Sequence, residues 1–136
     1  MQSVRLNAGM TLVEVLVALS LLVIGIAGGY TAISASMKNR QFAHNYYLGT
    51  LLANNQIERA KNLPFAQLTL LRESNVAINE EGSTDSEGRF RRTTSVTTSW
   101  GSNPNESKID VSVSIPLPLR EGFTTSTVST ILVNIQ

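Results

Sequence analysis

The stretch AGMTLVEVLVAL, residues 8–19, decides the fold, because it places one carboxylate, Glu14, near the start of an apolar segment. From Val15 to Met37 no residue carries a charge. An ionised carboxylate at membrane depth costs roughly 2.5 to 3.5 kcal/mol on insertion scales. A carboxylate retained despite this cost predicts a functional role for Glu14. The most direct role is to pair with a positive charge on another molecule.

The apolar segment is long enough to cross a membrane. As one helix, Val15–Met37 would measure about 35 Å at 1.5 Å per residue, against about 30 Å for the hydrocarbon core. A conventional secretory signal peptide and a plain single-span anchor are the alternatives. Glu14 argues against the signal peptide, which has a basic start followed by an apolar region. Basic residues flank the segment on both sides, so they leave the orientation open.

The residues around Glu14 resemble the processing site of type IV prepilins. The resemblance is strongest over residues 8–31. It consists of a short polar leader that ends in Gly9, then a small or apolar residue, Thr11-Leu12, an aliphatic residue and Glu14. Two departures are visible: Met10 stands where major members usually have Phe, and the leader holds a single charged residue.

The resemblance implies how this end of the chain is processed and used. A membrane aspartyl prepilin peptidase would cut after Gly9 and N-methylate Met10. Glu14 would then pair with the terminal amine of the neighbouring subunit as it leaves the bilayer. The leader would be cytoplasmic and the C-terminal domain exported. The precursor would lie in the inner membrane and the mature chain in a cell-surface pilus.

Glycines interrupt the apolar segment. Gly25, Gly28 and Gly29 each cost about 1 kcal/mol of helix propensity relative to Ala. Gly25 and Gly29 form a small-xxx-small pair, which permits close approach of helices within a membrane. In relatives of the family this part of the helix often loosens in the filament. The glycines suit either role, and the sequence does not choose between them. The residues expected to serve subunit interaction are Glu14, Gly25 and Gly29.

Residues 38–63 predict an amphipathic continuation of the same helix, which Pro64 ends. A helix over residues 11–62 would be about 78 Å long, the expected shape of a pilin stem. Residues on one stripe recur at steps of three and four: Phe42, Tyr46, Gly49, Leu52, Ala53, Gln56, Ile57 and Ala60.

The rest of the chain, residues 64–136, predicts a small globular β domain. Residues 64–88 form an irregular αβ loop, in which residues 65–71 could make a short helix or a strand over the sheet edge. Residues 79–88 are acidic but lack the EF-hand spacing, so they predict a solvated loop and no calcium site.

Three strands are expected, at Arg89–Trp100, Lys108–Ile115 and Thr124–Ile135. In the first, the alternation puts on one face Phe90, Arg92, Thr94, Val96, Thr98 and Trp100. In the second, the inward residues are Ile109, Val111, Val113 and Ile115. In the third, Val128 and Leu132 oppose Ile131, Val133 and Ile135, which indicates a bulge or a strand covered on both sides.

The predicted fold class is α+β and pilin-like: a long N-terminal helix packed on a small antiparallel sheet of three or four strands. We expect a leader over residues 1–9, a transmembrane or filament-core half over 10–37, an amphipathic half over 38–63, and the β domain. The sheet has one apolar and one polar face, as expected when one side meets water.

Composition and motifs narrow the function classes. The net charge of +1 gives no basic face for nucleic acid, and the lack of cysteine excludes disulfides and thiolate metal sites. No catalytic set, metal site or cofactor site is recognisable, and the lone His44 has no evident partner. We therefore expect a structural protein and no enzyme.

Residues 51–60, LLANNQIERA, resemble the stem of PilV-type minor pilins and of I-type minor pseudopilins of type II secretion. The former resemblance implies a low-abundance subunit that supports assembly at the fibre tip, and so adhesion, motility or DNA uptake. The implied partners are other minor and major pilins, the prepilin peptidase and the inner membrane. A secretion pseudopilin and a membrane-tethered binding domain remain the alternatives.

Overall fold

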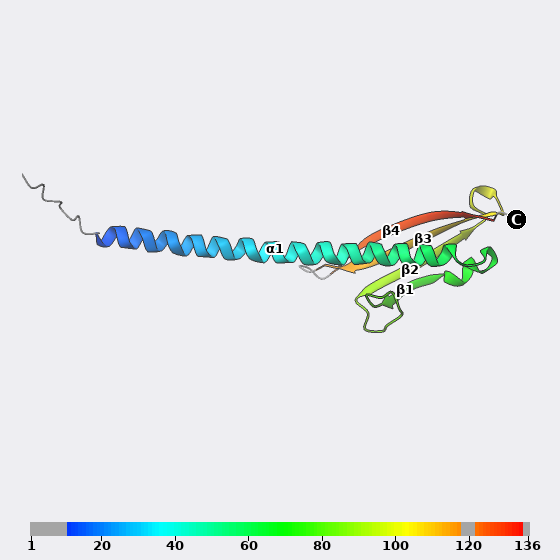
Figure 1. Ribbon diagram of the computed structural model, residues 1–136, viewed down its shortest axis with the longest axis horizontal. Coiled ribbons are helices and arrows are strands. Elements are labelled where there is room, and N and C mark those ends of the chain that lie inside the picture. Colours follow the sequence, from blue (N-terminus) through cyan, green and yellow to red (C-terminus); the bar gives the residue numbers. More distant parts are fainter. Residues whose placement is uncertain (1–10, 118–121, 135–136) are drawn as a thin grey trace, which may run out of the picture. The chain divides into compact units, whose positions relative to one another are not determined.

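The computed structural model of the protein describes residues 11–117 and 122–134. One long helix comes first, and a β domain follows it (Figure 1). The chain divides into two compact units after Lys38. The elements in chain order are α1 (Leu12–Lys61), η1 (Phe65–Leu71), β1 (Glu73–Ile78), β2 (Phe90–Thr98), η2 (Trp100–Ser102), β3 (Glu106–Pro116) and β4 (Phe123–Val133).

The first unit holds the part of α1 from Leu12 to Lys38. Its side chains are exposed throughout except for Ser34, which is half-buried. The helix is long and apolar enough to span a membrane, and its most apolar window has no buried residue. An exposed apolar surface of this extent marks a membrane or protein contact. The unit therefore needs lipid or other helices around it.

Hydroxyl groups in this apolar part of α1 bond to the helix itself. The Ser20 hydroxyl donates to the carbonyl of Leu16 at 2.8 Å, and that of Thr31 to the carbonyl of Gly28 at 2.8 Å. Back-bonding of this kind lets a polar side chain sit in an apolar helix. In lipid, polar groups must find such partners within the protein.

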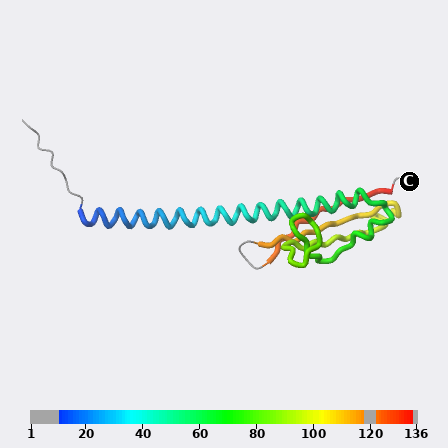
Figure 2. The backbone as a smooth tube through the Cα atoms, turned by 60° about the horizontal axis from the view of Figure 1, so that its bottom comes forward, coloured from blue at the N-terminus to red at the C-terminus, as the bar shows by residue number. Residues whose placement is uncertain are grey.

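The second unit is a four-stranded antiparallel sheet in the order β1-β2-β3-β4, with the C-terminal part of α1 packed on one face (Figure 2). The β3–β4 register runs without interruption from Glu106↔Val133 to Pro116↔Phe123. The sheet confirms the predicted α+β, pilin-like architecture. It has the larger of the two strand numbers expected.

The core lies between this helix segment and the sheet. Phe90 and the four predicted inward residues of β3 are fully buried. Gly49 lets the helix lie directly against β3, since a Cβ there would lie 2.5 Å from Ile115 Cδ1. The remaining helix residues in the core are Leu52, Ala53, Ile57 and Ala60.

The predicted helix stripe was wrong at its N-terminal end. Phe42 and Tyr46 are 38% and 45% exposed, whereas Asn45 is buried. The two rings contact each other on the outer side, with centroids 6.3 Å apart. The buried face is centred on Asn45 and Gly49 because the β3 side chains pack directly against Gly49.

The segment predicted as a loop over residues 64–88 contains one strand that was not predicted. Residues 65–71 form a 3₁₀ helix, one of the two forms expected, and β1 follows it. The register of β1 shifts between Glu73 and Val76, where Asn75 has a φ of +52°. This bulge breaks the alternation, so the short strand carries no clean period-2 pattern.

The third predicted strand shows neither a bulge nor cover on both sides. Val128 and Leu132 pack against the core, while Ile131 and Val133 are 49% and 55% exposed. Ile135 lies outside the described residues. Trp100, predicted as the last residue of the first strand and on the same face as Phe90, follows the end of β2 and is 38% exposed.

Candidate functional site

The predicted cleavage site, Gly9-Met10, lies outside the described residues, and the described chain begins at Thr11. Thr11 caps α1: its hydroxyl oxygen accepts a hydrogen bond from the backbone N–H of Glu14 at 3.3 Å. Thr followed three residues later by Glu is the capping-box pattern. An acid in the first turn is also favoured by the helix dipole. The observed cap is made by the Thr11 side chain with the backbone N–H of Glu14. The Thr-x-x-Glu pattern was its signal in the sequence and was missed there.

Gly25 and Gly29 lie within the continuous helix. A Cβ built at either position meets no heavy atom within 4 Å. Packing within the described chain therefore gives no reason for glycine at these two positions. Small residues on a helix surface allow another helix to approach closely. The exposed positions of Gly25 and Gly29 are therefore compatible with the predicted role in subunit interaction.

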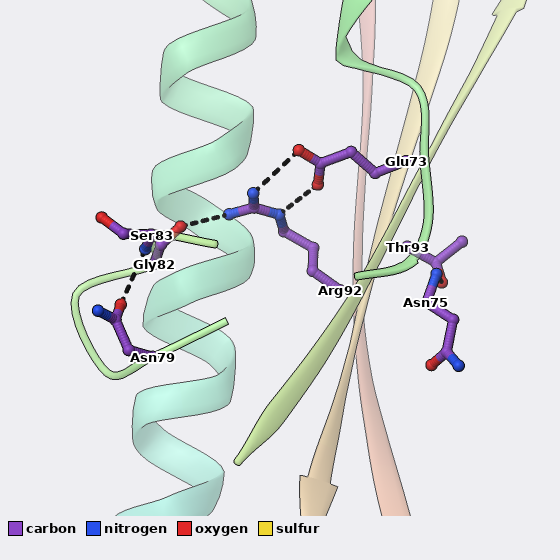
Figure 3. A network of polar contacts seen from close by, with 7 residues as sticks. All are labelled: Glu73, Asn75, Asn79, Gly82, Ser83, Arg92 and Thr93. Carbon is purple, nitrogen blue, oxygen red and sulfur yellow. Dashed lines mark hydrogen bonds and ion pairs between the residues drawn. The ribbon is translucent and has the colours of Figure 1, made fainter. Parts of the chain in front are cut away.

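A buried ion pair holds the β domain together on its inner face (Figure 3). Arg92 of β2 donates from Nε to one carboxylate oxygen of Glu73 at 2.7 Å, and from Nη2 to the other at 3.1 Å. The Arg92 side chain is only 5% exposed and that of Glu73 is 22% exposed. Two parallel bonds of this kind fix geometry as well as charge.

Arg92 also fastens the acidic loop to the sheet. Its Nη1 donates to the carbonyl of Gly82 at 3.1 Å, and Gly82 has a φ of +82°, which favours glycine. The Asn79 side chain accepts the N–H of Ser83 at 2.9 Å (Figure 3). The sequence predicted a solvated loop here. Arginine on the inward face of a strand was the signal that the loop is anchored.

The outer face of the sheet carries a small polar cluster. Lys108 lies 2.9 Å from the carboxylate of Asp110 and 4.9 Å from the centroid of the Trp100 ring. The hydroxyl of Ser129 donates to the same carboxylate. The hydrogen bond from Ser129 is the main cause that holds the pKa of Asp110 below its ordinary value of 3.8. Partial burial opposes this shift, and the hydrogen bond and positive charge of Lys108 add to it.

We expect Ser129→Ala to raise the pKa of Asp110 toward that ordinary value, as followed by a carboxyl NMR titration of the full-length chain. A lowered folded-state pKa contributes stability that is present above the unfolded value of 3.8 and is lost as the pH falls through the folded value. Since Asp110 is partly exposed, the effect on stability is small. Thr127→Ala, a loss of a hydroxyl on the same strand, is the control.

The part of the chain described shows no group of three His, Cys, Asp or Glu side chains that could hold a metal ion. His44 is exposed on α1. One hollow on the β domain has two arginines, Arg89 and Arg91, in its lining, and Gln41, Asn45 and Phe123 also border it. Its lining residues do not include a nucleophile paired with a general base. The N-terminal segment is therefore the site with the strongest functional signal.

Residues 4–30 match the family model of the prokaryotic N-terminal methylation motif. The match includes Gly9, Met10, Glu14, Gly25 and Gly29. Neither a curated protein nor a solved structure matches the chain. The motif indicates a prepilin of the type IV pilin or pseudopilin kind and a structural role. It fits a precursor anchored in the inner membrane by the apolar helix.

Proposed function

We propose that this chain is a minor type IV pilin, a low-abundance subunit that supports pilus assembly at the fibre tip, and through it adhesion, motility or DNA uptake. The observation that carries the proposal is the methylation motif at residues 4–30, which continues into a helix whose apolar side chains are exposed from Leu12 to Met37. Such a surface needs lipid before assembly and other helices afterwards.

Glu14 distinguishes a filament subunit from a simple tether. In a tether, an acid here could serve only the start of its own helix, whereas in a subunit it also supplies a pairing group. After cleavage at Gly9, Met10 would carry a new amine, and Glu14 of the next subunit would neutralise it. Leaving a desolvated charge without its partner costs about 3 to 5 kcal/mol, enough to control register and incorporation. Residues 1–9 would be the leader, 10–37 the membrane and filament part, 38–63 the stem and 64–136 the exposed domain.

Mass spectrometry of the mature N-terminus tests the class. We expect a chain that begins at N-methylated Met10 in wild-type cells. Glycine at the cleavage position lets the backbone enter a tight protease site, so Gly9→Val should leave the precursor uncut. Gly25→Val, a matched change at a distance from the cut, should still be processed. A wild-type chain that retains its leader would contradict the proposal.

A minor pseudopilin of type II secretion is the neighbouring candidate, because the stretch at residues 51–60 resembles both groups. Deletion of the chain separates the two. Loss of surface fibres with secretion intact supports the pilin, and loss of secretion with fibres intact supports the pseudopilin. Methylated Met10 without any filament phenotype would leave only the tethered domain.

A further inference from the structure

β4 is a long, unprotected edge of the sheet. Its eleven residues, FTTSTVSTILV, include no charge and no proline. It pairs with β3 in an unbroken register and is the last strand of the sheet. Over residues 11–117 and 122–134, no backbone hydrogen bond reaches its other side. Native proteins usually protect such an edge with charges, prolines, bulges or cover, because it can pair with another strand.

The opposite edge, β1, has these protections. It is six residues long and carries the bulge at Asn75. The acidic loop lies along its outer side: the N–H of Asp85 donates to the carbonyl of Ala77 at 3.0 Å, and Ile78 forms a bridge with Thr84. Arg92 holds that loop in place through Gly82. The β1 edge is short, bulged and covered at Ala77 and Ile78, whereas the β4 edge has none of these protections.

Exposed apolar side chains lie at both ends of the β4 edge. On the outer face of β4, Phe123 is 56% exposed, and Ile131 and Val133 are about half exposed. Trp100 lies near the same end as Ile131, because both are next to Lys108. A strand added beside β4 would give these side chains cross-strand partners, which aromatic and β-branched residues favour.

The direction of β4 limits what can pair with it. Gln41 and Phe123 border one hollow, and the hydroxyls of Thr50 and Ser126 are 3.0 Å apart. β4 therefore runs in the same direction as residues 39–61 of α1, as Figure 1 also shows. An antiparallel partner must run against this direction, and antiparallel pairing is the more stable kind per residue.

We propose that the β4 edge receives an antiparallel strand from a different membrane-anchored subunit of the same assembly. The inference rests on the proposed function, in which the helices of all subunits leave the same membrane in the same direction, each carrying its exported domain. Antiparallel pairing of β4 with the β4 of a second copy would reverse one of the two helices. Pairing with the β1 of a second copy is opposed by the bulge at Asn75 and by the loop bound at Ala77 and Ile78. The partner is thus another protein whose edge strand runs opposite to its own helix.

Site-specific photocrosslinking in the native membrane tests this, since the chain contains no cysteine. A maleimide–benzophenone probe is attached to full-length Thr127→Cys on β4, with Ser95→Cys on the same face of β2 as the control. We expect Thr127→Cys to give an adduct with a different membrane-anchored chain, at about five times the yield of Ser95→Cys. An adduct of two copies only, or equal yields from both positions, would overturn the proposal.

A charge variant gives a second reading. Thr127→Lys should lower recovery of the chain with its assembly about tenfold, because an edge lysine opposes strand pairing, while Ser95→Lys should change it less than twofold. Equal recovery of the two variants contradicts the proposal. The mature N-terminus is measured in the same samples. If Met10 is methylated and no β4 adduct forms, the edge inference alone fails; if Met10 is not methylated, the proposed function fails.

Discussion

We expect Glu14→Gln to lower the amount of this chain recovered in assembled fibres by at least about a hundredfold. The loss of about 3 to 5 kcal/mol for an unpaired desolvated charge exceeds the roughly 2.7 kcal/mol that corresponds to this factor. The amide keeps the size and polarity of the carboxylate but cannot neutralise the amine of a neighbouring subunit. The measurement is quantitative mass spectrometry of sheared fibres against the membrane fraction. Export of the β domain should be unchanged, because Glu14 lies in the other unit of the chain.

The capping box offers a competing explanation for Glu14, and the chain allows the two to be separated. Gln serves as well as Glu at the third helical position of a capping box. If Glu14 matters only as a cap, Glu14→Gln should assemble normally. Thr11→Ala gives the complementary case, since it removes the cap and keeps the charge. It should cost about 1 kcal/mol of helix stability and reduce incorporation only a few-fold.

Normal fibre incorporation of Glu14→Gln would contradict a charge-pairing role, and a defect in Thr11→Ala without one in Glu14→Gln would favour the cap. Glu14→Asp keeps the charge on a shorter side chain. The amount of this variant recovered in fibres should lie between the amounts of wild type and of Glu14→Gln. The abundance of processed chain in the membrane is the control for all variants. Fibre recovery expressed relative to this abundance excludes any effect of a variant on cleavage at Gly9.

Periodicity predicted those parts of the fold that are governed by local pattern. The end of α1 and the inward faces of β2 and β3 follow from regular spacing and a terminal proline. β1 could not be predicted in this way, because Asn75 breaks its alternation and only pairing with β2 makes it a strand. On β4, Ser126 is buried while Ile131 and Val133 are exposed. The register of β4 with β3, and not the hydropathy of its residues, decides which of its side chains face the core.

The candidate sites divide in the same manner. Glu14 and its surroundings are contiguous in sequence, so their chemistry could be predicted directly. The Arg92 cluster joins residues that are ten and nineteen positions apart, and they meet only when the loop folds back on the sheet. Inward-facing arginine is the kind of local inconsistency that marks such a network.

Arg92→Met should lower the free energy of unfolding by about 3 kcal/mol. Removal of one partner of a buried ion pair leaves the other charge desolvated, at a cost of about 3 to 5 kcal/mol. The lower value applies because the Glu73 side chain keeps 22% of its exposure. The measurement is denaturation of the full-length chain in detergent, followed by the fluorescence of Trp100, the single tryptophan.

The chain contains its own matched control. Arg89 pairs with Glu80 at the surface, where both side chains are about half exposed, and exposed pairs contribute about 0 to 1 kcal/mol. Arg89→Met should therefore change stability by less than about 1 kcal/mol. Equal losses from the two arginines would show that burial of the Glu73 pair does not matter. The double variant Arg92→Met/Glu73→Met should recover much of the loss, since no buried charge remains without a partner.

Loss of the pair should also have a local effect that global unfolding does not explain. Arg92 holds the loop through Gly82, and that loop covers the outer side of β1 at Ala77 and Ile78. In Arg92→Met a glutamate-specific protease should cut at Glu80 or Glu81 at least tenfold faster under native conditions, because local opening becomes easier. The uncovered β1 edge would then be free to pair, so the variant should also self-associate. Glu73→Gln should show both effects more weakly, since an amide can still accept a hydrogen bond from Arg92.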